Sequence, residues 1–374
     1  MAKAAFRAAT RRASAGPTGK WVVGPAEIAN MVHSIASGVP GVSSAMNAPH
    51  PFYANAYDYD LVGLTQGSLF PSLKRAKLFG ELVANHAGII YLGQNAFLGA
   101  QDDFREFEFR FITERGRHLV VMFTGSDIRS PEVMREIEER TGRPNIATYL
   151  SATAGSAGGR EHERVLKVTA DRAVQYADAI VTASVDQAGY LPQGTEPFRY
   201  FFPDEDVGSD LSKFDSGSPR VVLHAPSSPI LKGTPLVRAA VDSLRAEGLE
   251  FEYVELTGAS HEQVQAELER AHIVLNQFYA YVPGVFGVEA MAAGAVMLTS
   301  ADENIEPDLP RGSNEAWVVT QHFEVERKLR ELLLADAADL SAQAARGQKW
   351  VREHAVASVS SQAMRELLDR IENR

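Results

Sequence analysis

Cysteine is absent from the sequence, which excludes a disulfide framework and any thiolate metal site. Long apolar runs are absent as well: no stretch approaches the ~20 residues that span a bilayer, and residues 1–20 lack the apolar core of a signal peptide. Positive charge is not in excess, because 37 Lys and Arg stand against 48 Asp and Glu. The net charge of −11 argues against a duplex nucleic-acid partner, since clustered cations bind such partners. We therefore predict a cytoplasmic protein with no clear nucleic-acid binding.

Positive charge does gather at one place, in residues 1–18. This arm contains Lys3, Arg7, Arg11 and Arg12 and no acidic residue. One interpretation is a disordered or poorly packed tail. The other is a helix that makes a weak contact with an anionic membrane surface, so that the protein is peripheral at the membrane.

The rest of the chain alternates short apolar runs with longer amphipathic ones. Such alternation is typical of strand-helix units that build a mostly parallel sheet with helices on both faces. A chain of 374 residues, 45% hydrophobic, exceeds what one core usually serves, so two domains are expected. The predicted strands are residues 21–23, 88–92, 119–123, 179–183, 220–225, 250–256, 272–275 and 296–299, and the predicted helices are 26–37, 161–176, 235–247, 261–270, 287–293, 324–354 and 359–374.

The domain boundary is predicted from composition. Residues 206–219 are rich in Asp, Ser and Gly and have little apolar content, which is typical of a linker. We therefore assign residues 19–205 to an N-terminal domain and residues 220–350 to a C-terminal domain. Residues 351–374 are expected to form a helix that packs back on the N-terminal domain.

The first candidate site segment is the run Gly287-Val288-Glu289, where a helix is expected to open after a glycine. The unpaired N–H groups and the positive dipole end of a helix start suit a diphosphate. A carboxylate in the first turn, Glu289, could accept hydrogen bonds from two neighbouring ribose hydroxyls. The competing interpretation is that Glu289 is a solvated first-turn acid that stabilises its own helix.

A second candidate segment follows the strand at residues 220–225. Ligands bind outside the carboxyl ends of parallel strands, which is where Ser227, Ser228 and Lys232 are expected. Asn276 ends another predicted strand and is a further candidate donor at the same edge. These residues predict a site for an anionic ligand.

Asp127 is the candidate catalytic residue of the N-terminal domain. It lies in the Gly-Ser-Asp run after the strand at residues 119–123, where it could contact a donor sugar or an acceptor hydroxyl. An Asx-turn or a helix cap is the equally weighted alternative. Asp58 and Asp60 have the spacing of a cation site but lie in an aromatic loop, so we interpret them as a turn or an acceptor-side feature and predict no metal site.

Residues 224–233 together with residues 284–294 (GVFGVEAMAAG) resemble the C-terminal domain of family 4 glycosyltransferases, also called glycosyl transferases group 1. The resemblance implies the GT-B fold, an α/β architecture of two Rossmann-like, doubly wound domains that face a central cleft. It implies that Lys232 holds the phosphates of the donor and that Glu289 holds its ribose. Gly24 resembles the first glycine loop of the family, which approaches donor and acceptor.

The implied activity is transfer of a hexose-type sugar from a nucleoside-diphosphate sugar, with UDP or GDP as the nucleotide, to a hydroxyl acceptor on a glycan, lipid or protein. Transfer is expected to proceed with retention and without a metal or other cofactor, because a stabilised diphosphate leaves and the protein mainly positions and stabilises charge. The C-terminal domain would bind the donor and the N-terminal domain the acceptor.

Three departures from the family pattern keep other functions open. Tyr281 stands where many members have a second glutamate that contacts the sugar, and Thr124 stands where many have a histidine. Ser227 and its neighbours replace a basic residue. The alternatives are a catalytically silent GT-B binding or assembly protein and a nucleotide-sugar epimerase.

Overall fold

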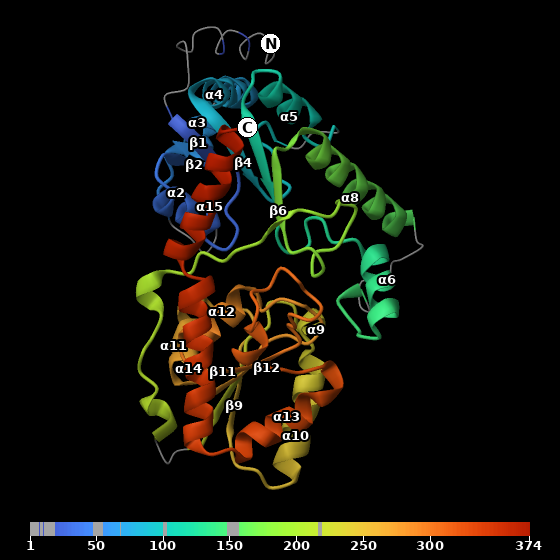
Figure 1. Cartoon of the computed structure of the whole chain (residues 1–374), viewed down its shortest axis with the longest axis vertical. Coiled ribbons are helices and arrows are strands. Elements are labelled where there is room, and N and C mark those ends of the chain that lie inside the picture. Colours follow the sequence, from blue (N-terminus) through green and yellow to red (C-terminus); the bar gives the residue numbers. More distant parts are fainter. Residues whose placement is uncertain are drawn as a thin grey trace.

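The computed structural model describes residues 7, 10, 19–47, 55–67, 69–99, 103–147, 157–215 and 219–374. The described chain forms two α/β units stacked along its long axis (Figure 1). The basic arm predicted at residues 1–18 lies outside the described residues apart from Arg7 and Thr10, so the arm and its membrane contact stay predictions. Within the described residues, no helix has both the length and the apolar composition needed to cross a membrane.

The first unit contains a seven-stranded sheet in the order β3-β2-β1-β4-β5-β6-β7, with every neighbouring pair parallel. Its central strands are apolar and buried on both faces, as parallel strands between two helix layers must be. The strands are β1 (Gly19–Gly24), β2 (Val42–Met46), β3 (Tyr59–Asp60), β4 (His86–Leu92), β5 (His118–Met122), β6 (Ala179–Thr182) and β7 (Glu196–Pro197).

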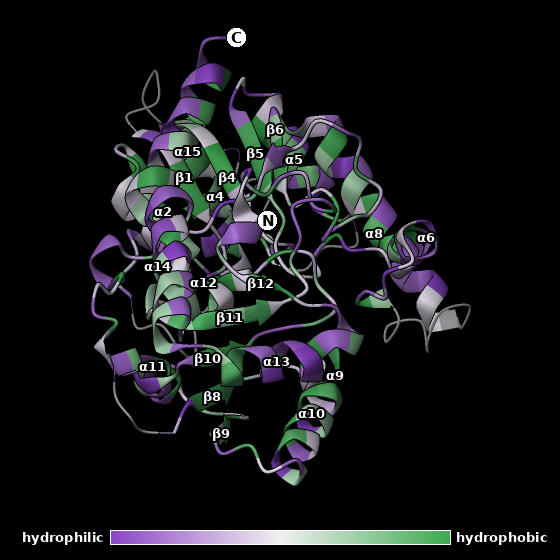
Figure 2. Ribbon diagram, turned by 60° about the horizontal axis from the view of Figure 1, so that its bottom comes forward, coloured by the Kyte–Doolittle hydropathy of each residue, from purple (hydrophilic) through white to green (hydrophobic). Residues whose placement is uncertain are grey.

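The second unit contains a five-stranded parallel sheet in the order β12-β11-β10-β8-β9. Its strands are β8 (Val221–His224), β9 (Glu252–Glu255), β10 (Ile273–Leu275), β11 (Val296–Thr299) and β12 (Val318–Val319). Figure 2 shows β4, β5 and β11 largely hydrophobic, whereas helices such as α11 and α13 are largely hydrophilic. The predicted α/β fold class is confirmed.

Helices cover both faces of each sheet. In the second unit α10 and α13 lie on one face, and α11, α12 and α14 lie on the other (Figure 1). The helices are α2 (Met31–Gly38), α3 (Leu61–Thr65), α4 (Pro71–Asn85), α5 (Glu106–Thr113), α6 (Pro131–Thr141), α8 (Ala157–Tyr176), α9 (Pro229–Lys232), α10 (Thr234–Ala246), α11 (His261–Arg270), α12 (Gly284–Ala292), α13 (Val325–Leu334), α14 (Ala337–His354) and α15 (Ala357–Glu372).

The helices expected at residues 26–37 and 324–354 differ from those observed. The helix expected at residues 26–37 begins only at Met31, because Ala29 and Asn30 adopt left-handed conformations with φ of 51° and 62°. The helix expected at residues 324–354 is divided into α13 and α14. At the break, the Arg220 guanidinium donates to the carbonyl oxygens of Leu332 and Ala335, which satisfies the last turn of α13.

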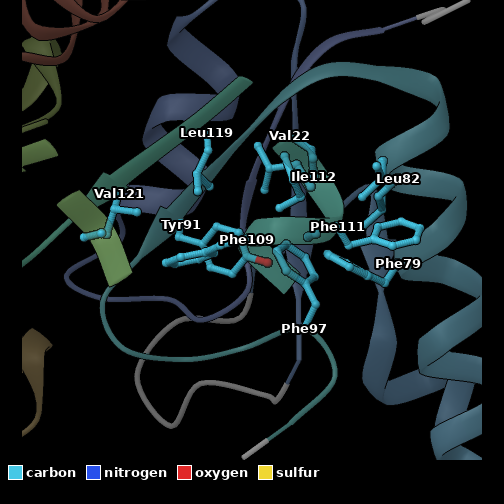
Figure 3. Close-up of a cluster of buried hydrophobic side chains, with 14 of the residues drawn as sticks. Val22, Phe79, Leu82, Tyr91, Phe97, Phe109, Phe111, Ile112, Leu119 and Val121 are labelled. Carbon is cyan, nitrogen blue, oxygen red and sulfur yellow. The ribbon is translucent and has the colours of Figure 1, made fainter. Parts of the chain in front are cut away.

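An aromatic cluster fills the core between the first sheet and α4 and α5 (Figure 3). The rings of Tyr91 and Phe97 meet edge to face at 5.2 Å, and those of Tyr91 and Phe109 at 5.0 Å. The Tyr91 hydroxyl donates to the buried Glu108 carboxylate at 2.5 Å, so the polar tip of the ring is satisfied. This core holds β4 and β5, and the carboxyl end of β5 leads to the candidate residue Asp127.

The chain crosses between the two units twice, and the crossings lie side by side. Phe202 N donates to Ala355 O at 2.9 Å, and Ala357 N donates to Phe202 O at 2.6 Å. The helix after the second crossing, α15, packs beside α2 on the first sheet (Figure 1). There Leu368 is buried, and Trp21 Nε1 donates to Glu372 Oε1 at 2.6 Å. The second crossing follows His354, slightly later than the boundary assigned at residues 350–351.

Candidate functional site

The strand order of the second sheet defines where a ligand would bind. From β8 the chain passes through α10 to β9 on one side and then returns through α11 to β10 on the other side of β8. Such a reversal is a topological switch point, and α/β sheets bind ligands in the crevice outside the carboxyl ends of the two strands that flank it. Lys232 ends the short helix α9, which follows β8, and Asn276 and Gln277 lie in the loop after β10.

Lys232 lies at this switch point and reaches the loop after β10. Its Nζ donates to Gln277 Oε1, and Gln277 Nε2 donates to Val282 O at 2.6 Å, just before α12. Burial lowers the pKa of Lys232 to about 8; Asp186 of the first unit opposes this effect, and Arg129 adds to it. Gln277 thus joins the lysine to the start of α12.

Helix α12 begins one turn earlier than the sequence predicts. Its first residue is Gly284, whose N–H donates to the Tyr200 hydroxyl at 3.1 Å. Glu289 therefore lies in the second turn, so the prediction that the helix opens at Gly287 with Glu289 in its first turn is wrong. The reason is that the turn at Pro283 already directs the chain into the helix, and nothing between Gly284 and Gly287 interrupts it.

Gly287 and Asn276 pack α12 against the sheet. A Cβ atom at Gly287 would lie 2.8 Å from Asn276 Nδ2 and 2.9 Å from Met297 Sδ. The buried Asn276 donates through Nδ2 to Pro283 O at 2.7 Å. The glycine is therefore required for close contact with this protein's own side chains, and the predicted contact of both residues with a donor is untested.

Adding a methyl group at Gly287 should lower the free energy of unfolding by about 2 kcal/mol, because Asn276 and Met297 have to move. Urea unfolding of Gly287→Ala measures this loss. Val285→Ala, at an exposed position of the same helix, should change the stability by less than about 0.5 kcal/mol. Equal stability of Gly287→Ala and the unmodified protein would contradict the close packing.

Glu289 and Val288 line a cleft of about 710 Å³ between the units. Its other walls are the loop at Asn30 in the first unit, the crossing segment at Tyr200, and α11. Glu289 Oε1 lies 3.0 Å from Nε2 of His261, and the glutamate side chain is 12% exposed. The hydrogen bond with Glu289 raises the pKa of His261. The carboxylate therefore faces the cleft from a partly buried position and is already paired.

The serines of the loop after β8 are exposed. Ser227 and Ser228 lie between β8 and α9, and Ser228 O accepts from Lys232 N at 2.9 Å. They lie at the same carboxyl edge as the lysine.

Gly24 ends β1 and lies against β2. A Cβ atom there would collide with Ala45 O, so the sheet itself requires glycine. Beyond it, the buried Glu27 accepts from Val32 N at 2.9 Å and from His33 N at 3.1 Å. This carboxylate accepts hydrogen bonds from the free N–H groups at the start of α2, where an anionic ligand would otherwise bind. A donor contact near Gly24 stays a prediction.

Asp127 closes the turn after β5. Its Oδ2 accepts from Thr124 N at 2.9 Å and from Thr124 Oγ1 at 3.0 Å. Burial raises the pKa of Asp127, whereas these hydrogen bonds and the nearby Arg105 and Arg129 lower it. The carboxylate binds back to Thr124, three residues earlier, so it forms neither an Asx-turn nor the cap of α6, which is Ser130; a contact with substrate is untested.

Asp58 and Asp60 make separate contacts, one with β2 and one at the start of α3. Asp58 Oδ2 accepts from Ser44 N at 2.8 Å, and Asp60 Oδ1 caps α3 by accepting from Val62 N at 2.8 Å. Among the described residues, no group of three or more His, Asp and Glu side chains is arranged to hold a metal ion.

Tyr281 anchors the second unit in the first. Its buried ring packs among apolar residues that include Met134 and Ile137 of α6. The hydroxyl accepts from Asn145 Nδ2 at 3.2 Å and donates to Arg143 O at 3.3 Å. The position that holds a sugar-contacting glutamate in the resembled family is thus occupied here by a contact between the units.

Three residues that the sequence analysis did not select complete this contact. Arg129 Nη2 donates to Asp186 Oδ2 at 2.6 Å, and Asp186 Oδ1 accepts from Tyr281 N at 2.7 Å. From the second unit, Glu306 Oε2 accepts from Val185 N at 2.9 Å and from Asp186 N at 2.6 Å. Burial raises the pKa of Glu306 to about 7. One feature of the sequence points to two of these residues as site candidates: Arg129 and Asp186 follow the carboxyl ends of β5 and β6.

No known family model matches the chain, and no curated protein matches it in sequence. Solved structures do match. Sucrose-phosphate synthase from Thermosynechococcus elongatus aligns with a TM-score of 0.59 at 12% identity, over 96% of this chain and 100% of that chain. An alpha-glucosyltransferase in complex with UDP and a 13-mer DNA containing a HMU base aligns with a TM-score of 0.57 at 10% identity, over 96% of this chain and 100% of that one.

A third neighbour is trehalose-6-phosphate synthase, with a TM-score of 0.51 at 9% identity, over 94% of this chain and 98% of that chain. All three neighbours are glycosyltransferases of the GT-B fold, and the alignments span both units of this chain. The two parallel sheets with helices on both faces therefore form a GT-B fold, as the sequence resemblance predicted.

Proposed function

We propose that the protein is a glycosyltransferase that transfers a hexose-type sugar from a nucleoside-diphosphate sugar to a hydroxyl acceptor, with retention and without a metal. The observation that carries the proposal is the pairing of Lys232 with Gln277 at the switch point of the second sheet, next to the start of α12. A cation and helix N–H groups at one crevice are suited to a diphosphate. The GT-B neighbours, among them structures with bound UDP, support the same ligand class.

In this proposal Lys232 binds the diphosphate and stabilises the charge that develops on it as the glycosidic bond to the sugar breaks. Glu289 accepts hydrogen bonds from the ribose after its bond with His261 is released. Asp127, at the carboxyl edge of the first sheet, contacts the donor sugar or the acceptor hydroxyl. Retention is supported by the family 4 resemblance of the segments around Lys232 and Glu289.

The test is incubation with a panel of UDP- and GDP-sugars, with release of the nucleoside diphosphate followed in the presence of hydroxyl acceptors or water. Release that is lost in Glu289→Ala, with unfolding unchanged, would support the proposal. Exchange of the donor into a new nucleotide sugar would instead indicate an epimerase. Binding without any turnover would indicate a silent GT-B binding protein. This alternative is favoured by Tyr281, which contacts the first unit at the position where the resembled family has a sugar-contacting glutamate.

Binding of uridine diphosphate should weaken as the pH rises through about 8. Burial lowers the pKa of Lys232 to about 8, so the free protein loses this positive charge as the pH passes that value. A bound diphosphate favours the charged amine, and the affinity should fall by up to about tenfold for each pH unit above 8. Calorimetric titration across this range measures the slope. Lys232→Met should show weak binding that lacks this pH dependence, and a matching slope in that variant would contradict the assignment.

A further inference from the structure

Two apolar side chains project into solvent from the segment between α3 and α4. Leu69 is 89% exposed and Phe70 is 60% exposed, although both are of the size that folded proteins usually bury. Directly after them, Lys74 and Lys77 lie on the outer face of α4, whose opposite face buries Phe79 in the core. Apolar tips and ammonium groups therefore share one exposed surface.

The charge of this surface is opposite to that of the protein. Residues 61–80 contain Lys74, Arg75 and Lys77 and no acidic residue, whereas the whole chain has a net charge of −11. Lys74 Nζ donates to Leu64 O at 2.8 Å, which holds its charge near the apolar side chains. Lys77 lies 3.8 Å from Glu81, and both side chains are largely exposed, so this pair is weak.

Two other large apolar side chains of the described residues are exposed to a similar degree but have different charged neighbours. Phe323 and Leu334 are 69% and 70% exposed, matching the residue types of the first pair. They border α13, where Glu326 and Glu331 flank the basic residues and pair with them. Leu69 and Phe70 thus lie beside basic residues with few acidic neighbours, whereas Phe323 and Leu334 lie beside basic residues that are paired with glutamates.

We propose that Leu69 and Phe70, together with Lys74, Arg75 and Lys77, form a docking tip that binds the surface of an anionic lipid bilayer. The two apolar side chains enter the boundary between headgroups and acyl chains, and the basic side chains contact anionic headgroups while their stems lie along the interface. A bilayer suits this surface because Leu69 and Phe70 are largely exposed and because the basic residues beside them give the tip a local positive charge that attracts an anionic surface. The proposal does not depend on the glycosyltransferase activity.

The tip adjoins the edge of the first sheet. Strand β3 pairs with the last residues of β2, and α3 follows directly from Asp60 at the end of β3. Docking at this tip would therefore hold the first unit against the membrane through the α3 and α4 segment, independently of residues 1–18.

The experiment is co-sedimentation of the full-length protein with vesicles of phosphatidylcholine alone and of phosphatidylcholine mixed with phosphatidylglycerol. The unmodified protein should bind the mixed vesicles and not the neutral ones. Leu69→Ser/Phe70→Ser should weaken binding at least about tenfold, because both apolar side chains lose their burial in the interface. Lys74→Gln/Lys77→Gln should weaken it about fivefold for each charge removed. Thermal melting of each variant checks the fold.

The matched control is Phe323→Ser/Leu334→Ser, which removes the same residue types at similar exposure and should bind as the unmodified protein does. Equal weakening by the control and by Leu69→Ser/Phe70→Ser would overturn the proposal, because the loss would then be nonspecific. Full binding in both tip variants would also overturn it and would assign membrane contact to residues 1–18. Absence of vesicle binding by the unmodified protein would overturn it in favour of an acidic protein partner.

Discussion

Lys232→Ala should bind uridine diphosphate about a hundredfold more weakly than the unmodified protein. The ammonium group is the cation that the switch point of the second sheet offers to a diphosphate, and a charge-assisted hydrogen bond of this kind contributes about 1.5–3 kcal/mol. The loss should not come from unfolding. Burial lowers the pKa of Lys232 to about 8, which means that the folded protein disfavours this charge, so its removal should leave the stability unchanged or raise it.

Calorimetric titration near pH 7 measures the affinity, and urea unfolding checks the fold. Lys349→Ala provides the control, because Lys349 is exposed and pairs with Glu353 of its own helix. It should bind uridine diphosphate with the affinity of the unmodified protein. If Lys232→Ala also retained that affinity, the lysine would not be part of the nucleotide site.

Asp186→Ala should produce the largest loss of stability, about 4 kcal/mol in the free energy of unfolding. The carboxylate is buried, pairs with Arg129 at 2.6 Å and accepts the N–H of Tyr281 at 2.7 Å. Removing it leaves a buried guanidinium without its partner, which costs about 3–5 kcal/mol. Because Tyr281 belongs to the second unit, the loss should also weaken the contact between the units.

Urea unfolding of Asp186→Ala is compared with that of the double variant Arg129→Met/Asp186→Ala. The double variant should recover part of the loss, since it removes the uncompensated charge. Glu161→Ala, which breaks an exposed pair with Arg164, should show no measurable change. A double variant less stable than Asp186→Ala would show that Arg129 is stabilised by other partners.

The architecture was predictable because it depends on local patterns. Apolar runs such as Ile89 to Leu92 in β4 and Val221 to Leu223 in β8 are buried on both faces, and that burial produces the alternation read from the sequence. The position of Lys232 at the carboxyl edge of the second sheet followed from the same alternation, whereas Glu289 lies one turn further into its helix than predicted. Strands as short as β3 and β12 leave no periodic signal, and they were not predicted.

The details of the site depend on contacts between distant residues. Gly287 was expected at the start of a helix that binds a diphosphate, yet its close neighbours are Asn276 and Met297. Tyr281 was interpreted as the loss of the glutamate that contacts the sugar in the resembled family. In the structure its ring fills a space beside α6. The partners of Arg129 and Asp186 lie far away in sequence, and a single sequence carries no signal of such pairing.

The return of α15 to the first sheet has a consequence for how the protein is made. Trp21 of β1 pairs with Glu372, at a sequence separation of 351 residues, and the side of β1 that carries Trp21 and Val23 packs against Leu368 and its neighbours. During synthesis this face of the first sheet therefore stays exposed until the second unit and α15 have been translated. Contacts of such separation form slowly, and exposed apolar surface is prone to aggregation. We expect nascent chains that end before α15 to depend on chaperones.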